Sequence, residues 1–282
     1  GDVASIHSLL DTPTNVNASD GVTRVTPLHL AAMCGNSDAV QMLVDAKASV
    51  DVQDENGYTP IHRAAENDHG GAVRVLVDAK ASLDFKGRDA MTPMHRAAQN
   101  GHNDALQMLI DAKASVDIHD QYGWIPMHHA ARSGHSDCVQ VLIDAKTSVD
   151  VKDTDSYTPL HHAASNDQIG VVQVLIDAKA CLDIRDYLGK TPMHRAAIHD
   201  YADIVRMLVD AKAGLDIQDK NGETPLHYAA SYHYSGIAQV LVNAKASVDV
   251  RNNNGATPLR IAVSKGHSGL GQLLVAAKAN VD

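Results

Sequence analysis

Large side chains are scarce in this chain of 282 residues, which contains one Phe, one Trp and eight Tyr. A single large globular core would lack bulk with so few aromatic rings. Small and branched side chains must therefore fill the interior, which favours thin layers of closely spaced helices. Cysteine is also rare, and Cys34, Cys138 and Cys181 are widely spaced with no Cys-x-x-Cys pair. This pattern predicts free thiols in a reducing, intracellular setting, and hence a cytoplasmic protein.

Positive charge and long apolar runs are missing as well. Lys and Arg number 24 against 34 Asp and Glu, which gives a formal net charge of −10. This balance argues against nucleic acid and anionic membrane surfaces as partners. No apolar stretch approaches the roughly 20 residues that span a bilayer, so no membrane insertion is expected. The chain begins at Gly1 rather than Met, which fits a piece of a larger protein.

One short motif is abundant and recurs every 33 residues. In a typical copy, Thr-Pro precedes a His and a pair of Ala, as in Thr59-Pro-Ile-His-Arg-Ala-Ala65. The eight copies start at Thr26, Thr59, Thr92, Ile125, Thr158, Thr191, Thr224 and Thr257, which we call the cap positions. They define repeats 1 to 8 over residues 21–53, 54–86, 87–119, 120–152, 153–185, 186–218, 219–251 and 252–282. Residues 1–20 are predicted to form a partial capping repeat and loop, because Val3, Ile6, Leu9 and Leu10 have helical apolar spacing.

The residues of one repeat predict two short helices and a projecting finger. Thr is a good N-cap that accepts a backbone N–H of the first turn, and Pro suits the first helical position. The Ala pair lets neighbouring helices approach closely. A second amphipathic stretch follows, for example at residues 105–110, and then an extended segment and a turn that usually contains Gly. One such unit cannot bury its own apolar face, so the units must stack on their neighbours.

The TPLHxA motif and the 33-residue period resemble the ankyrin repeat. The resemblance covers residues 21–282 and implies an all-α repeat solenoid of ankyrin-type helix-turn-helix units with β-hairpin or loop fingers, forming one domain. It also implies a non-catalytic scaffold, predicted to be a monomer without cofactor or metal, that binds a partner protein through a concave groove and finger tips. The alternative is a regulatory or targeting segment of a larger enzyme, channel or pathogen effector whose active part lies outside this chain.

The end of the second helix departs from the family pattern. Gly usually closes this helix in a left-handed conformation, but here every repeat has Lys, at Lys47, Lys80, Lys113, Lys146, Lys179, Lys212, Lys245 and Lys278. If the backbone stays left-handed, each Lys costs about 1 kcal/mol relative to Gly. Asp recurs beside these lysines, two residues before and four residues after. We interpret this pattern as a ladder of solvated ion pairs between repeats, with a charged recognition surface as the alternative.

Repeat 4 departs at its cap position. Ile125 replaces Thr there, directly after the only tryptophan, Trp124. Loss of the cap should cost about 1 kcal/mol, so the substitution Ile125→Thr is predicted to raise stability. The replacement is interpreted as an extension of an apolar binding spot around Trp124.

The 17 histidines do not indicate catalysis. Seven belong to the motif, and four others, His69, His102, His135 and His267, lie ten residues after a cap position. Their recurrence indicates structural roles, since an active site is needed once. His129 and His162 could meet across repeats and hold Zn²⁺, but no Cys or Glu stands nearby in sequence as a further ligand. No HExxH, GxSxG or P-loop motif occurs, so no enzyme activity is expected.

Positions that vary between repeats are free to serve function, whereas constant positions build the scaffold. The variable positions lie four, three and one residues before the cap, and four, seven and eight residues after it. Finger positions hold five of the ten aromatic residues, namely Tyr58, Tyr122, Trp124, Tyr157 and Tyr187. The first-helix positions add Arg63, Arg96, His129, Arg132, His162, Arg195, His199, Tyr228 and Tyr232.

These residues predict a protein-binding groove centred on repeats 2 to 6. Aromatic fingers would clamp an extended segment, with Trp124 as the central anchor, and the Arg and His side chains would meet acidic groups on it. Three alternatives stay open: the rings staple adjacent fingers together, the first-helix face is merely solvated, or the Arg side chains pair with finger carboxylates such as Asp89 and Asp155. Protonation of His129, His162 and His199 near pH 6 is predicted to tune the affinity.

Overall fold

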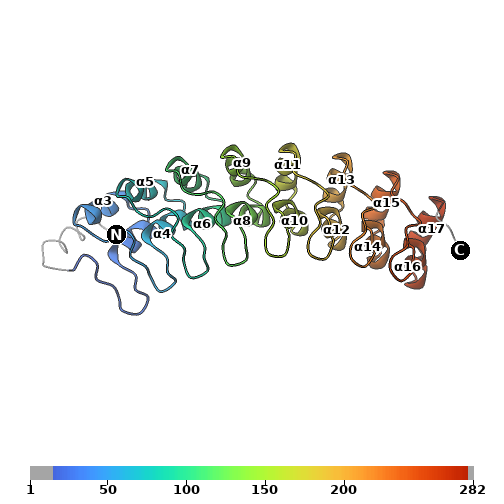
Figure 1. Ribbon diagram of the computed structural model, residues 1–282, viewed down its shortest axis with the longest axis horizontal. Coiled ribbons are helices and arrows are strands. Elements are labelled where there is room, and N and C mark those ends of the chain that lie inside the picture. Colours follow the sequence, from blue (N-terminus) through green and yellow to red (C-terminus); the bar gives the residue numbers. More distant parts are fainter. Residues whose placement is uncertain (1–14, 279–282) are drawn as a thin grey trace. The chain divides into compact units, whose positions relative to one another are not determined.

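The computed structural model describes residues 15–278, and sixteen helices in this range follow one another in pairs. Its contacts divide the chain into two compact units, residues 1–147 and residues 148–282, which we call unit 1 and unit 2. Each repeat contributes one pair, of which we call the first the inner and the second the outer helix (Figure 1). The grouping of all eight repeats into one domain stays a prediction, and most of the predicted partial repeat lies outside the described residues.

Unit 1 contains the helices of repeats 1 to 4. Its inner helices are α2 (Pro27–Met33), α4 (Pro60–Glu66), α6 (Pro93–Asn100) and α8 (Pro126–Ser133). Its outer helices are α3 (Ser37–Asp45), α5 (Gly70–Asp78), α7 (Asn103–Asp111) and α9 (Ser136–Asp144). Each inner helix packs against its own outer helix, and α2, α4, α6 and α8 pack against one another in chain order. The inner and outer helices therefore form two layers.

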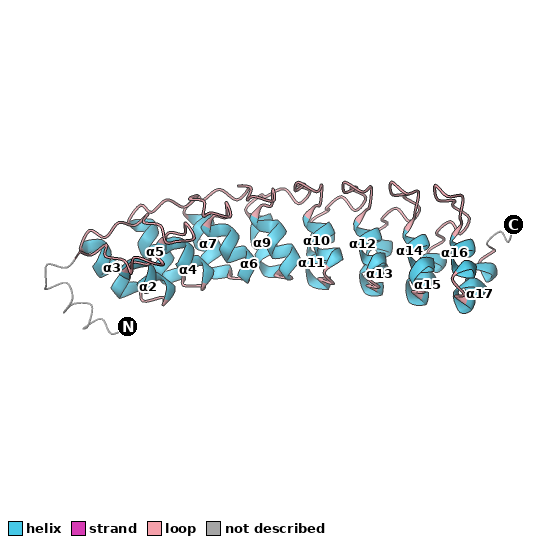
Figure 2. Ribbon diagram, turned by 90° about the horizontal axis from the view of Figure 1, so that it is seen from below, coloured by secondary structure: helices cyan, strands magenta, loops and turns pink. Residues whose placement is uncertain are grey.

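Unit 2 has the same construction from the helices of repeats 5 to 8. Its inner helices are α10 (Pro159–Ser165), α12 (Pro192–Ile198), α14 (Pro225–Tyr232) and α16 (Pro258–Ser264). Its outer helices are α11 (Ile169–Asp177), α13 (Ala202–Asp210), α15 (Ser235–Asn243) and α17 (Ser268–Ala276). Residues 15–278 contain no β-strand, and in each unit the fingers are loops that project beside the helix pairs (Figure 2). The predicted all-α repeat fold is confirmed, with loop fingers rather than β-hairpins.

A buried Thr–His pair fixes the start of most inner helices. In repeat 3 the Thr92 hydroxyl lies 2.8 Å from Nδ1 of His95, and the Thr92 N–H donates to the same nitrogen at 3.1 Å. Because Nδ1 accepts, the proton sits on Nε2, which donates to the Trp124 carbonyl of the next finger at 3.0 Å. The Thr hydroxyl also faces the His ring in repeats 1, 2, 5, 6 and 7. These histidines are structural, as predicted.

Ile125 occupies the cap position of repeat 4 and is fully buried. Its N–H still donates to Nδ1 of His128 at 3.2 Å, so the backbone half of the Thr–His arrangement survives. The interpretation of Ile125 as an extension of an exposed apolar spot is therefore wrong, because its methyl groups fill the core.

The lysines that follow the outer helices do adopt the left-handed conformation, with φ between 63° and 70°. Their predicted ladder of ion pairs is wrong, since none of the ion pairs among residues 15–278 includes one of these eight lysines. The neighbouring carboxylates instead accept backbone N–H groups of the next repeat. Asp51 accepts from Ser82 at 2.8 Å, and Asp183 accepts from Gly214 at 2.8 Å. The recurring Asp therefore joins successive repeats through the backbone.

The three cysteines are free thiols, as predicted, with Cys34 and Cys181 exposed and Cys138 buried. Among the described residues, no helix combines the length and apolar character that crossing a membrane requires.

Candidate functional site

An Asp five residues before the cap position organises most fingers and joins them to the inner helix. In repeat 4, Oδ1 of Asp120 accepts the N–H groups of Tyr122 at 2.8 Å and Trp124 at 2.9 Å. Its other oxygen lies 2.8 Å from Nε2 of His129, nine residues further along the chain. The corresponding pairs in other repeats are Asp54–Arg63, Asp153–His162, Asp186–Arg195 and Asp219–Tyr228. Sequence analysis missed this Asp, although its fixed nine-residue spacing to a donor was visible.

Arg63, Arg96 and Arg195, which we call the Arg stripe, are each neutralised by a carboxylate within the protein. Arg63 pairs with Asp54 and, at 2.8 Å, with Glu66. Burial lowers the pKa of Arg63, but its hydrogen bonds to the two carboxylates outweigh burial and raise the pKa overall. Arg195 pairs with Asp186 rather than with the suggested Asp155. Pairing of Arg with finger carboxylates, left open by the sequence, is therefore the arrangement that the structure contains.

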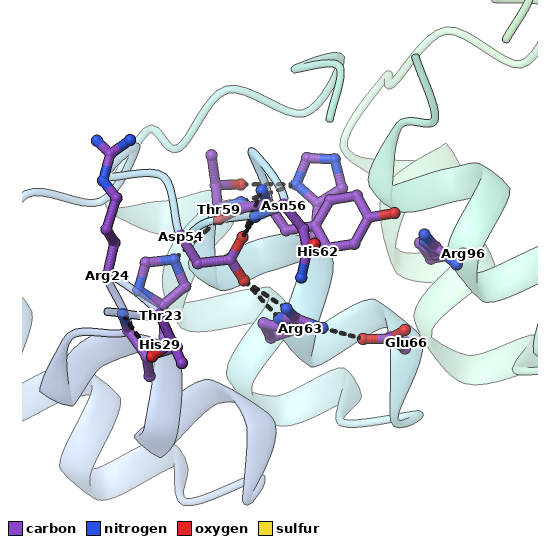
Figure 3. A network of polar contacts seen from close by, with 12 residues as sticks. Thr23, Arg24, His29, Asp54, Asn56, Thr59, His62, Arg63, Glu66 and Arg96 are labelled. Atoms are coloured by element: carbon purple, nitrogen blue, oxygen red, sulfur yellow. Dashed lines mark hydrogen bonds and ion pairs between the residues drawn. The ribbon is translucent and has the colours of Figure 1, made fainter. Parts of the chain in front are cut away.

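Repeat 3 joins its finger to the inner helix differently, because Gly87 stands where most fingers have Asp. The Tyr58 ring of the preceding finger fills that space, and a Cβ on Gly87 would lie 2.3 Å from Cε1 of Tyr58. The Tyr58 hydroxyl donates to Asp89 at 2.5 Å, and Asp89 also accepts from Arg96 at 2.7 Å. The guanidinium groups of Arg63 and Arg96 lie 5.0 and 4.5 Å from the Tyr58 ring centre. Figure 3 shows the Asp54–Arg63–Glu66 part of this network beside Arg96.

Tyr58 is therefore a staple between fingers rather than an exposed anchor. Only 6% of its surface is accessible. Burial also lowers the pKa of Arg96, whose Nε is buried without a hydrogen-bond partner.

Trp124 and Tyr122 line a hollow of about 580 Å³ between repeats 3 and 4, which we call the Trp124 hollow. Repeat 3 contributes Asp89, Met91, Arg96 and Gln99, and repeat 4 contributes Asp120, Gln121, His129, Arg132 and Ser133. The Tyr122 side chain is prominent, with 58% of its surface exposed. The two rings are tilted against each other, with centres 6.2 Å apart. This hollow contains five of the predicted site residues, so the structure gathers them in one place.

The wall behind Trp124 is held by the buried hydrogen bond between His129 and Asp120. The His129 ring packs edge-on against the indole at 4.9 Å, and the Arg132 guanidinium lies 5.3 Å from the indole centre. Burial would raise the pKa of Asp120, but the hydrogen bonds from His129 and the finger N–H groups hold it below its usual value. His129 and Arg132 therefore pack against the indole and fix its position, so the aromatic wall is preorganised.

A second hollow lies between repeats 1 and 2 and was not predicted. It measures about 350 Å³ and is lined by the apolar side chains of Val25, Leu30 and Met33, with Asp20, Thr23, His29 and Arg63 at its border. Leu30 and Met33 are 49% and 42% exposed. We call it the Leu30 hollow. The sequence signal was present, because repeat 1 has Leu and Met where repeats 2 to 4 have charged or polar residues.

Unit 2 contains the other predicted site residues. The Tyr157 ring lies under the Arg195 guanidinium at 4.6 Å, and burial raises the pKa of Tyr157 to about 12. His162 pairs with Asp153 at 2.9 Å, and the buried Tyr228 donates to Asp219 at 2.7 Å. The more exposed residues are Tyr187, His199 and Tyr232. No group of three or more His, Cys, Asp or Glu among residues 15–278 is arranged to hold a metal ion.

Comparisons with known proteins agree with this architecture. A family model described as ankyrin repeats (3 copies) matches residues 1–87, 79–155, 145–221 and 211–282. A putative palmitoyltransferase ZDHHC13 from Danio rerio is 48% identical over 50 residues, which cover 18% of this chain and only 8% of that protein. The crystal structure of the ankyrin repeat domain of Bcl-3, a member of the IkappaB family, is similar with a TM-score of 0.69 and 23% identity. That similarity covers 89% of this chain and 98% of the Bcl-3 chain.

Stacked repeats of this kind present extended binding surfaces, and ankyrin repeats are protein-interaction modules that are generally non-catalytic. The residues that match the family model include all of the described helices and the repeated motif at which the inner helices begin. This chain belongs to the ankyrin repeat family.

Proposed function

We propose that this chain is a protein-binding scaffold whose main contact surface in unit 1 is the Trp124 hollow. The observation that carries the proposal is the preorganised aromatic wall: Tyr122 is 58% exposed, and Trp124 is held from behind by His129. Exposed aromatic rings beside hydrogen-bonding side chains are typical of residues that dominate binding energy at interfaces. Gln99, Gln121 and Ser133 supply such groups around the rings.

An acidic segment as the partner, which the sequence suggested, has weaker support than protein binding itself. Arg63, Arg96 and Arg195 already bind internal carboxylates, so a partner carboxylate would have to replace an existing ion pair. We therefore place the contact at the aromatic wall rather than at the Arg stripe. The exposed rings of Tyr187 and Tyr232 form a separate candidate contact in unit 2.

The test uses the chain as bait for crosslinking and mass spectrometry, followed by affinity measurement with the purified partner. Tyr122→Ala should weaken binding about tenfold and Trp124→Ala about thirtyfold, the loss typical of an interface hot spot. Gln140→Ala, on the exposed face of α9, is the control and should leave the affinity unchanged. A partner that binds both ring variants as tightly as the parent chain does not use this hollow, and the proposal is then wrong.

A second candidate is an ankyrin segment that recruits substrates or regulators for a larger enzyme. The match to a putative palmitoyltransferase favours it, although that match covers only 50 residues. Sequencing the full-length transcript decides between the two, because this candidate requires a catalytic domain in the same protein.

A further inference from the structure

We infer that unit 1 recognises a short, extended and uncharged peptide segment that carries two apolar side chains about five or six residues apart. This inference rests on the proposed function and specifies the partner. One apolar side chain enters the Leu30 hollow and the other packs on the aromatic wall of the Trp124 hollow.

The two hollows occupy equivalent places on the repeats. Residues three and one before the cap, and four and seven after it, line both hollows. In the Leu30 hollow these are Thr23, Val25, Leu30 and Met33. In the Trp124 hollow repeat 4 supplies Tyr122, Trp124, His129 and Arg132 at the same positions. Because successive inner helices of unit 1 pack side by side, equivalent positions face the same side, and one extended ligand can reach both hollows.

The Leu30 hollow has the chemistry of an aliphatic pocket. Val25, Leu30 and Met33 form its floor, and Met adapts readily to differently shaped apolar groups. Its acidic border residue, Asp20, is occupied by the N–H groups of Val22, Thr23 and Arg24 at 3.2, 2.8 and 2.9 Å. An inserted cationic side chain would compete with those bonds, whereas an aliphatic side chain would not.

The surface between the hollows favours a segment without charge. Arg63 is bound by Asp54 and Glu66, and Arg96 is bound by Asp89. The first of these clusters occupies the centre of Figure 3, with Arg96 beside it. Each of these charged groups has a partner at hydrogen-bonding distance, so a charged peptide residue placed against them would lose its hydration and gain no free counter-charge. Peptide amide groups can instead bond Nε2 of Gln99 and Oδ1 of Asn100, because the internal hydrogen bonds of these two side chains use only Oε1 of Gln99 and Nδ2 of Asn100.

The spacing of the anchors follows from helix packing. The Leu30 hollow lies between α2 and α4, and the Trp124 hollow lies between α6 and α8, so the two are two repeats apart. Neighbouring packed helices are about 8–10 Å apart, which places the hollows about 16–20 Å from one another. An extended peptide advances about 3.3 Å per residue and therefore covers this distance with five or six residues.

The experiment is a selection of randomised 14-residue peptides on the intact chain. We expect enriched peptides to contain an aliphatic residue and a second apolar or aromatic residue five or six positions apart, with uncharged residues between them. Binding of the leading synthetic peptide should change the fluorescence of Trp124, which reports the hollow directly because the chain contains a single Trp. Leu30→Ser and Tyr122→Ser should each weaken that peptide about tenfold, since both anchors act within one ligand.

Matched controls separate this inference from general effects. Ile169→Ser changes an aliphatic residue of α11 with similar exposure, 44%, and should leave peptide affinity unchanged. A selection that yields no binders, favours acidic runs, or shows no fixed spacing of apolar residues overturns the inference. In that case the proposed function still stands if a protein partner loses affinity with Tyr122→Ala, so the two can fail separately.

Discussion

The eight lysines that end the outer helices hold a backbone conformation that suits Gly. In repeat 5, Lys179 has φ of 63°, and the following Ala180 N–H donates to the Leu175 carbonyl at 3.0 Å to close the helix. A Cβ in this conformation crowds the following carbonyl oxygen. Lys at this position therefore lowers the free energy of unfolding in every repeat. Among the described residues, no ion pair of these lysines offsets that cost.

Replacement of one such Lys by Gly should stabilise the protein. Lys179→Gly removes the strain but raises the entropy of the unfolded chain, so we expect a net gain of about 0.5–1 kcal/mol in free energy of unfolding. Urea denaturation followed by circular dichroism measures the change. The control is Lys152→Gly, in the same unit but without positive φ, which should lower stability. Equal effects of the two substitutions would contradict the argument.

Ile125 shows how burial changes a prediction made from the sequence. Ile125→Thr would restore a hydroxyl beside His128, worth about 1 kcal/mol, but it removes apolar volume from a site with 0% exposure. Thr has two side-chain carbons fewer than Ile, and each buried carbon that is lost costs about 0.8 kcal/mol. We now expect the free energy of unfolding to fall by about 0.5–1 kcal/mol, whereas Ile125→Ala should lose about 2 kcal/mol or more. Thermal and urea denaturation distinguish these outcomes, and a large gain for Ile125→Thr would show that capping dominates burial.

At the scale of elements, the fingers of repeats 2 and 3 are coupled through Tyr58 and Gly87. The Tyr58 ring stands where the Asp of another finger would be, and Asp89 replaces that Asp in binding the inner helix. Each of these exchanges depends on the other. A substitution at Tyr58 or Gly87 therefore affects the fingers of both repeats.

Gly87→Ala is expected to destabilise the chain by about 1–3 kcal/mol, because the new Cβ overlaps the Tyr58 ring. In the background of Tyr58→Ala the same substitution should cost less than 0.5 kcal/mol, since the ring is gone. A double-mutant cycle measured by urea denaturation gives the coupling energy. Additive costs would mean that the backbone of Gly87, and not the ring, is the sensitive feature.

The fold was largely predictable from particular residues, and the site only in part. Thr-Pro at a fixed period specifies where each inner helix begins, and the left-handed lysines were expected at the right positions. The ion pair between Asp54 and Arg63 joins a finger to an inner helix across nine residues of sequence. Because the sequence does not show this contact directly, Arg63 was predicted to be available to a partner. The burial of Tyr58 depends on a glycine 29 residues later, which no local pattern reveals.

At the scale of the whole chain, the recurring histidines are a shared pH-sensitive feature. Burial lowers the pKa of His29, His62, His95, His161 and His194 to about 4. Their Nδ1 atoms accept the backbone N–H of the cap residue, so a proton on that nitrogen breaks this hydrogen bond. Unfolded histidine titrates near 6.5. Between these values the unfolded state binds more protons than the folded state.

The free energy of unfolding should therefore be fully retained above about pH 6.5 and should fall as the pH falls towards 4. Each histidine contributes a slope of about 1.4 kcal/mol per pH unit in that window, so five acting together make acid unfolding steep and place it above the range of ordinary Asp titration. Far-ultraviolet circular dichroism against pH, with urea denaturation at pH 7.5 and 5.5, measures this loss. His95→Gln lowers the starting stability but should reduce the slope by the equivalent of one proton, because Gln cannot be protonated in the unfolded chain. A stability that stays constant from pH 7.5 to 5 would mean that these rings accept a proton while the helices remain folded, and the fixed Nε2–H form that joins successive repeats would then not be needed for the stack.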